Sequence, residues 1–164
     1  MKLPKNSQDG FSFVEIIVVM GILSTLIGIT SLTLVSTRSN VSLNTSVSTL
    51  ISDLKSQQIK SMVGDTEGRA TNDTYGIYFE QDKYTLFHGL LYSPSDPSNF
   101  SVKLDEPARI SSIQLPSSSI IFSLKSGDVV GFSPSQNSLT FQDSVTGEQK
   151  IIFINSYGVI TSVE

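Results

Sequence analysis

The sequence predicts an α+β fold, in which one long N-terminal helix packs on a C-terminal antiparallel β domain. Two observations support this class. Residues 16–35 are uncharged and are followed by apolar residues spaced three or four apart as far as Gly64, which is typical of helix. From residue 75 onward, short alternating segments separated by Gly, Pro and Ser are typical of strands. A helix followed by a run of strands favours segregated α and β layers.

The uncharged segment from Ile16 to Val35 has the length of a membrane span. Twenty helical residues cover ~30 Å, which matches a bilayer hydrocarbon core. A secretory signal would be shorter and would end at small residues such as alanine, but no alanine precedes Ala70. The segment is therefore expected to stay in the protein. Lys2 and Lys5 precede it and favour a cytoplasmic N-terminus.

The second part of the helix is predicted to be amphipathic and to lay its apolar face on the sheet. Gly64 is a stop signal for this helix, so a single helix is expected from about Ser12 to Val63. The apolar positions are Leu43, Val47, Leu50, Ile51, Leu54, Ile59 and Met62.

The chain length allows one domain with appendages. The expected divisions are a leader (1–10), the N-terminal helix (11–63, with 11–35 transmembrane and 36–63 amphipathic), a loop (64–74) and the β domain (75–164). The expected strands are 75–80, 83–92, 100–104, 109–115, 119–124, 129–132, 139–142, 149–154 and 157–163.

Glu15 is the one charged residue at the head of the apolar run. A carboxylate at a bilayer centre costs roughly 2.5–3.5 kcal/mol, and less near the headgroups. One interpretation is an acid that reaches the membrane surface. The other is an intermolecular ion pair: a cut after Gly10 would give Phe11 a new α-ammonium group, four residues from Glu15 on the same helix face.

Residues 10–23, Gly-Phe-Ser-Phe-Val-Glu-Ile-Ile-Val-Val-Met-Gly-Ile-Leu, resemble the prepilin-type N-terminus of type IV pilins and type II secretion pseudopilins. The resemblance implies cleavage between Gly10 and Phe11 by prepilin peptidase, N-methylation of Phe11, and inter-subunit assembly through Glu15. It also implies a pilin-like fold. The order of the last expected strands and their glycine turns, with the turn at Gly158, resembles the minor, H-type pseudopilins more loosely.

The resemblance implies a structural subunit of a type IV pilus or type II secretion pseudopilus filament, as a minor component. The subunit would be held first in the cytoplasmic (inner) membrane by a single span, with an extracytoplasmic C-terminal domain. It would then enter an extracellular or periplasmic filament. The implied partners are prepilin peptidase, other pilin or pseudopilin subunits, and an inner-membrane assembly platform with its ATPase. Two alternatives stay open: a tip module for binding, adhesion or DNA uptake, and a single-pass anchored domain that never polymerises.

The remaining features of the sequence do not indicate an enzyme, a cofactor site or a metal site. The chain has no cysteine, and its net charge of −4 argues against nucleic acid as the main ligand. The single histidine, His88, is expected to be a packed or exposed side chain. Asp143 and Glu148 could bind calcium, or could form a solvated turn. The same alternatives apply to Asp65, Glu67, Asn72 and Asp73, and the tyrosines at 75, 78, 84 and 92 could form an exposed patch or fill the core.

Overall fold

The computed structural model describes residues 11–163, except for the side chains of residues 30–40. Helix α1 (Phe13–Val63) is followed by eight strands among the described residues. The chain forms two compact units, residues 1–37 and residues 38–164. Helix α1 contributes to both units, and each unit is described separately below.

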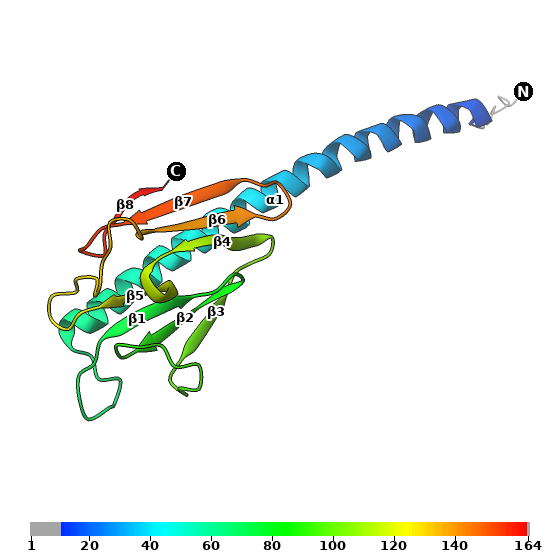
Figure 1. The fold of residues 1–164 in the computed structure, drawn as a ribbon. Helices are drawn as coiled ribbons and strands as arrows, with labels where there is room; N and C mark the ends of the chain where they lie inside the picture. Colours follow the sequence, from blue (N-terminus) through cyan, green and yellow to red (C-terminus); the bar gives the residue numbers. More distant parts are fainter. Residues whose placement is uncertain (1–10, 164) are drawn as a thin grey trace, which may run out of the picture. The chain divides into compact units, whose positions relative to one another are not determined.

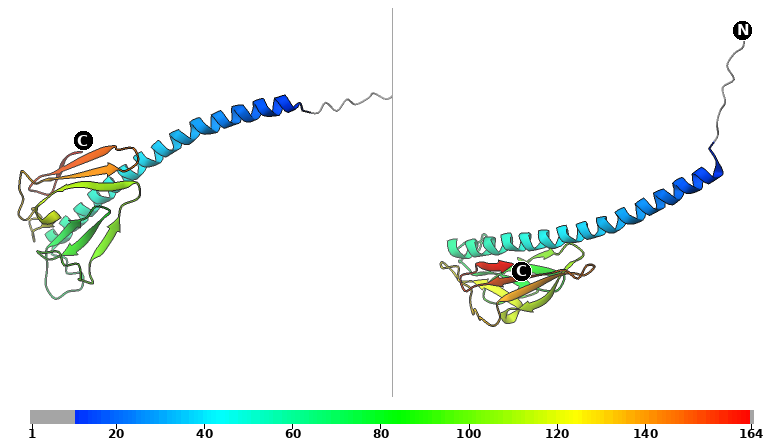
Figure 2. Two further views of the ribbon diagram at one scale, coloured as in Figure 1. Left: turned by 45° about the vertical axis from the view of Figure 1, so that its right-hand side comes forward. Right: turned by 90° about the horizontal axis from the view of Figure 1, so that it is seen from above.

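In the second unit, α1 lies along one side of the strands (Figures 1 and 2). Every third or fourth residue of this part of the helix is buried, so the helix supplies a continuous apolar stripe to the core. Leu43, Val47, Leu50 and Leu54 are at most 5% exposed. The strands supply the rest of the core, chiefly Ile77, Phe79, Tyr84, Ile110, Ile120, Phe122, Leu139, Phe141, Ile152 and Ile154.

Two four-stranded antiparallel sheets form the β part of this unit. The first sheet has the order β3-β2-β1-β5 and the second has the order β4-β6-β7-β8. The first sheet contains β1 (Tyr75–Phe79), β2 (Lys83–His88), β3 (Phe100–Lys103) and β5 (Ser119–Phe122). The second contains β4 (Ala108–Gln114), β6 (Ser138–Asp143), β7 (Gln149–Ile154) and β8 (Ile160–Val163), and a short 3-10 turn, η1 (Pro116–Ser118), precedes β5.

The α+β class, the helix and the antiparallel sheets confirm the corresponding sequence predictions. Helix α1 ends at Val63, immediately before Gly64, which has a φ of +66°. Eight of the nine expected strands are present; 149–154 has the expected ends and the other seven have shifted ends. The division of the chain into leader, helix, loop and β domain stays a prediction.

The prediction of a strand at residues 129–132 is wrong. Val129 makes only an isolated bridge to Phe122. Gly131 has a φ of +67°, in the left-handed region, and this turns the backbone away from an extended path directly after Val130. The alternating apolar residues therefore gave a strand signal where the chain makes turns.

Strand β2 also ends earlier than expected, at His88 and not at Tyr92. Gly89, with a φ of +95°, turns the chain there, and its amide donates to the Thr74 carbonyl at 2.8 Å. Tyr92 then folds back so that its ring stacks on Tyr78, with centroids 4.1 Å apart.

Polar side chains of α1 fix the helix to the sheets at its C-terminal end. The hydroxyl of Ser61, which is fully buried, donates to the Phe122 carbonyl at 3.0 Å and accepts from the Tyr75 amide at 2.8 Å. Gln58 donates through Nε2 to the carbonyls of Gly127 and Tyr157, at 2.9 and 2.7 Å. These bonds give partners to backbone groups of β1, β5 and two turns, which the hydrogen bonds between strands do not pair.

Gly76 is the second residue of β1 and lies opposite Phe87 of β2. A Cβ built at Gly76 would lie 2.7 Å from the Ile120 carbonyl oxygen and 2.9 Å from the Phe87 ring. The ring therefore covers a position that no side chain can occupy. This arrangement is the packing of an aromatic residue over a strand glycine.

Candidate functional site

The candidate site is the N-terminal end of α1, in the first unit. The Ser12 carbonyl accepts hydrogen bonds from the amides of Glu15, at 3.0 Å, and Ile16, at 3.2 Å, so Ser12 begins the helix. Glu15 lies in the first helical turn. A carboxylate is favourable there because the free amides of the first turn carry partial positive charge.

Phe11 lies just before this helix, which begins at Phe13, and Glu15 lies in its first turn. They line a shallow groove of about 340 Å³ together with Ile16, Val19, Met20 and Leu23. From the sequence, Phe11 and Glu15 were expected on one helix face, whereas Phe11 precedes the helix and both residues border this groove. Gly10, the residue expected before the cleaved bond, lies outside the described residues, so the roles of Gly10, Phe11 and Glu15 stay predictions.

The remaining surface of this helix is apolar on all sides. Phe11 is 81% exposed and Phe13 is 76% exposed, and Glu15 is the one charged residue between residues 11 and 29. A helix that is hydrophobic all round is stable only when another apolar phase covers it. The other exposed apolar residues are Val14, Ile16, Ile17, Val18, Val19, Met20, Ile22, Leu23, Leu26, Ile27 and Ile29.

At two glycines of this helix, no neighbour among the described residues would prevent a larger side chain. A Cβ at Gly21 or Gly28 would meet nothing within 4 Å. Each glycine instead leaves a small, open stretch of helix surface. Small residues of this kind allow a second helix to approach closely.

The membrane span expected at residues 11–35 is not confirmed. Within the part of the chain that the structure describes, no helix combines the length and the apolar character needed to cross a membrane.

The structure also places the other candidate residues. Asp143 is 1% exposed, and its Oδ1 accepts from the amides of Val145 and Thr146 at 2.7 and 2.8 Å. Its carboxylate thus closes the turn between β6 and β7. No group of three or more potential metal ligands occurs among the described residues. Of the tyrosines, Tyr75 and Tyr84 are in the core.

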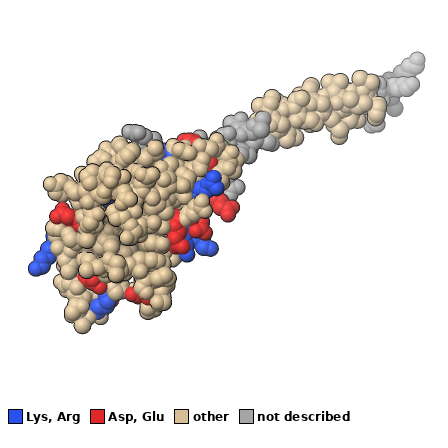
Figure 3. Space-filling model, in the orientation of Figure 1, with Lys and Arg blue, Asp and Glu red and all other residues tan. Residues whose placement is uncertain are grey.

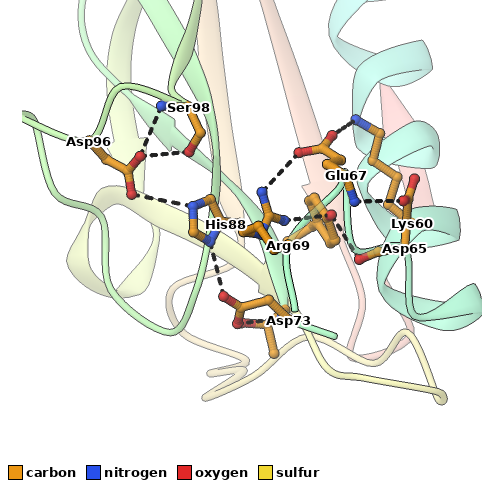
Figure 4. Close-up of polar contacts among 10 residues, drawn as sticks. Lys60, Asp65, Glu67, Arg69, Asp73, His88, Asp96 and Ser98 are labelled. Atoms are coloured by element: carbon orange, nitrogen blue, oxygen red, sulfur yellow. Dashed lines mark hydrogen bonds and ion pairs between the residues drawn. The ribbon is translucent and has the colours of Figure 1, made fainter. Parts of the chain in front are cut away.

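The loop of residues 64–74 is tied to α1 and β1. Glu67 accepts from Lys60 of the helix and from Arg69, the latter at 3.3 Å (Figure 4). The Arg69 guanidinium also donates to the Tyr75 hydroxyl at 2.7 Å. The hydrogen bond from Lys60 lowers the pKa of Glu67, and Arg69 adds to this effect.

Sequence reasoning missed the contacts of His88. Its Nδ1 lies 2.9 Å from Asp73 Oδ2, and its Nε2 lies 3.3 Å from Asp96 Oδ2 (Figure 4). The two acids are distant in sequence and lie in different loops, so no local pattern connects them. The one available signal was a single histidine between two loops that each contain an aspartate.

No curated protein and no solved structure matches the chain. Residues 5–31 match the family model of the prokaryotic N-terminal methylation motif. The matched range contains the Gly10–Phe11 bond, Glu15 and most of the apolar run. This N-terminal stretch therefore carries the prepilin-type signal of type IV pilins and pseudopilins.

Proposed function

We propose that this chain is a structural subunit, and a minor component, of a type IV pilus or a type II secretion pseudopilus. Prepilin peptidase cuts it between Gly10 and Phe11 and methylates the new N-terminus. The subunit is then assembled into a filament. The prepilin-type motif at residues 5–31 supports processing of this kind.

The observation that carries the proposal is the groove shared by Phe11 and Glu15. After cleavage, Phe11 would bear an ammonium group four residues before the Glu15 carboxylate. Within one subunit this is a one-turn separation, and between subunits it offers a cation and an anion for neighbouring helices. Both charges sit in apolar surroundings, so each is tolerable only when the other is close.

The exposed apolar surface of residues 11–29 supports storage in a membrane before assembly. The span of residues 11–35 would lie in the cytoplasmic membrane, with the β domain on the extracytoplasmic side. On extraction, packing against other subunits would replace the lipid, and Gly21 and Gly28 would allow close helix contacts. Other pilin-type subunits and an inner-membrane assembly platform with its ATPase are the partners.

The charge distribution gives no support to a nucleic-acid-binding role. The net charge is −4. On the face drawn in Figure 3, the coloured Lys and Arg side chains are scattered and several lie beside Asp or Glu. Duplex or single-stranded DNA would instead require a continuous basic surface.

Mass spectrometry of the protein purified from membranes tests processing. The expected mature chain begins with an N-methylated phenylalanine at position 11. Glu15→Ala should leave membrane insertion and cleavage intact but abolish incorporation into filaments, measured by immunoblotting of sheared filaments. Ser24→Ala, which changes a polar side chain in the same helix, is the matched control.

An intact leader on the membrane-bound protein, together with no dependence of any assembly on Glu15, would contradict the proposal. The chain would then be an anchored domain that does not polymerise. Cleavage with normal incorporation of Glu15→Ala would retain the processing step and eliminate the ion pair.

A further inference from the structure

His88 connects two loops of the second unit through its two ring nitrogens. Asp73 belongs to the loop of residues 64–74, between α1 and β1. Asp96 belongs to the loop of residues 89–99, between β2 and β3. The side chain of His88 is 19% exposed, and those of Asp73 and Asp96 are 36% and 29% exposed. The imidazole contacts both acids across this gap (Figure 4).

Each carboxylate is held by its own loop through its other oxygen. Asp73 Oδ1 accepts from the Thr74 amide at 2.8 Å. Asp96 Oδ1 accepts from the amide and the hydroxyl of Ser98, at 2.9 and 2.6 Å. Both Oδ2 atoms consequently face the imidazole with fixed positions, and neither acid is free to turn away without breaking its own loop.

The number of protons on the imidazole decides how many of these contacts are attractive. An ionised carboxylate can only accept hydrogen bonds. The imidazolium has two N–H donors and satisfies both acids, whereas neutral imidazole has one N–H and presents a lone pair to the second carboxylate. The geometry with both contacts formed is thus the geometry of the charged ring.

We infer that His88 is a proton-dependent clamp, which joins the loops at residues 64–74 and 89–99 when charged and releases one of them when neutral. The contact to Asp96 is the longer of the two, so the loop of residues 89–99 is the one released. This inference is independent of the proposed function, because it concerns only the second unit.

The charged groups around the ring are consistent with this assignment. Hydrogen bonds from Ser98 lower the pKa of Asp96, with smaller contributions from His88 and Arg69. Asp96 therefore stays an ionised acceptor at mildly acidic pH. The titratable groups near the ring are Asp73, Glu67 and Arg69 of the first loop, Lys60 of α1, Tyr75 of β1, and Asp96.

The released loop carries apolar residues. Leu90 and Leu91 are 62% and 81% exposed, and Tyr92 stacks on Tyr78 of β1. Its turn amides are held by hydrogen bonds from Asp96 to Ser93 and from Asn99 to Asp96, both 3.2 Å. Loss of the His88–Asp96 contact would therefore also loosen the turn and the segment that carries these leucines.

The first experiment uses the full-length protein in detergent micelles, with ¹⁵N-labelled histidine. His88 is the only histidine in the sequence, so each imidazole nitrogen signal is assigned without ambiguity. Below its titration the ring should show two protonated nitrogens, and above it one. Hydrogen exchange of the 89–99 segment, corrected for the intrinsic pH dependence of exchange, should be about tenfold slower with the charged ring. The β6–β7 hairpin is the internal reference and should not respond.

Asp96→Asn gives the decisive variant. Its side-chain oxygen still accepts from Ser98, so its amide NH₂ faces Nε2 and can donate only to the neutral ring. The pH response of the 89–99 segment should therefore reverse, with protection at higher pH. Asp128→Asn, at an exposed residue of the turn after β5, is the matched control and should respond like the unmodified protein. Equal exchange at both pH values, or an unchanged response in Asp96→Asn, would overturn the clamp.

Discussion

Tyr84 joins α1 to the first sheet through one buried hydroxyl. Its ring is fully buried, and its hydroxyl donates to Asp53 Oδ2 at 2.6 Å. Burial raises the pKa of Tyr84, and the hydrogen bond to the Asp53 carboxylate raises it further. The phenol therefore remains a donor throughout the neutral and mildly alkaline range.

Tyr84→Phe should destabilise the second unit by about 1–2 kcal/mol, because a hydrogen bond to a charged acceptor is lost. The loss of stability should be constant across neutral pH, because the raised pKa of Tyr84 keeps its hydroxyl protonated and donating in this range. Urea unfolding followed by circular dichroism measures it. Tyr157→Phe, at a residue that is 67% exposed, should change stability by less than about 0.5 kcal/mol.

Glu67 contributes a pH-dependent part of stability, since its folded pKa is lowered. A lowered carboxyl pKa means that the contribution is present above the pKa of the unfolded chain and is lost as the pH falls through the folded value. Glu67→Gln should reduce the loss of stability on acidification, which is the acid limb of the stability curve. It should change stability at neutral pH by less than about 1 kcal/mol, because the Lys60–Glu67 pair is about one-third exposed.

The unfolding midpoint between pH 3 and pH 7 measures the effect of Glu67→Gln. Glu148→Gln, at an exposed position of the β6–β7 turn, is the control and should leave the acid limb unchanged. An identical acid limb in both variants would show that Lys60 and Glu67 do not pair in solution.

The elements themselves were largely predictable, because periodicity reports burial directly. The apolar residues of α1 from Leu43 to Leu54 repeat at helical spacing and are buried. Strand ends were less predictable, since they depend on single residues with positive φ. Gly89 shortens β2 and Gly131 prevents a strand after Val129, and neither turn conformation follows from the identity of glycine alone.

Leu50 provides the element-scale prediction. It is fully buried between α1 and the sheets, and replacing it by alanine would leave a cavity. Leu50→Ala should cost about 2–5 kcal/mol in the free energy of unfolding, measured by chemical denaturation. Ile59→Ala, at a position of the same helix that is 59% exposed, should cost less than about 1 kcal/mol. Equal effects would show that this helix face does not form the core.

At the scale of the whole molecule, the buried core among the described residues belongs to the second unit. Every residue of the core cluster lies between Leu43 and Ile154. A chain restricted to residues 38–164 should therefore unfold cooperatively and with the same midpoint as the full-length protein, measured by thermal denaturation in the same detergent. A broad transition, or a midpoint many degrees lower, would show that the first unit contributes to folding of the second.

The candidate sites differ in how far the sequence revealed them. The N-terminal site was proposed from the sequence because Gly10, Phe11 and Glu15 are close in sequence, and their roles stay predictions. The environment of His88 was not, because Asp73 and Asp96 reach the ring only after both loops have folded. Tyr84 and Asp53 are a further pair of this kind, 31 residues apart.

The glycine beneath the Phe87 ring has an evolutionary consequence. Among homologous chains that keep this sheet, position 76 should stay glycine whatever residue stands at position 87, because the atom nearest to a Cβ there is the backbone carbonyl oxygen of Ile120. An invariant glycine at position 76, without covariation with position 87, is therefore the expected record of this contact.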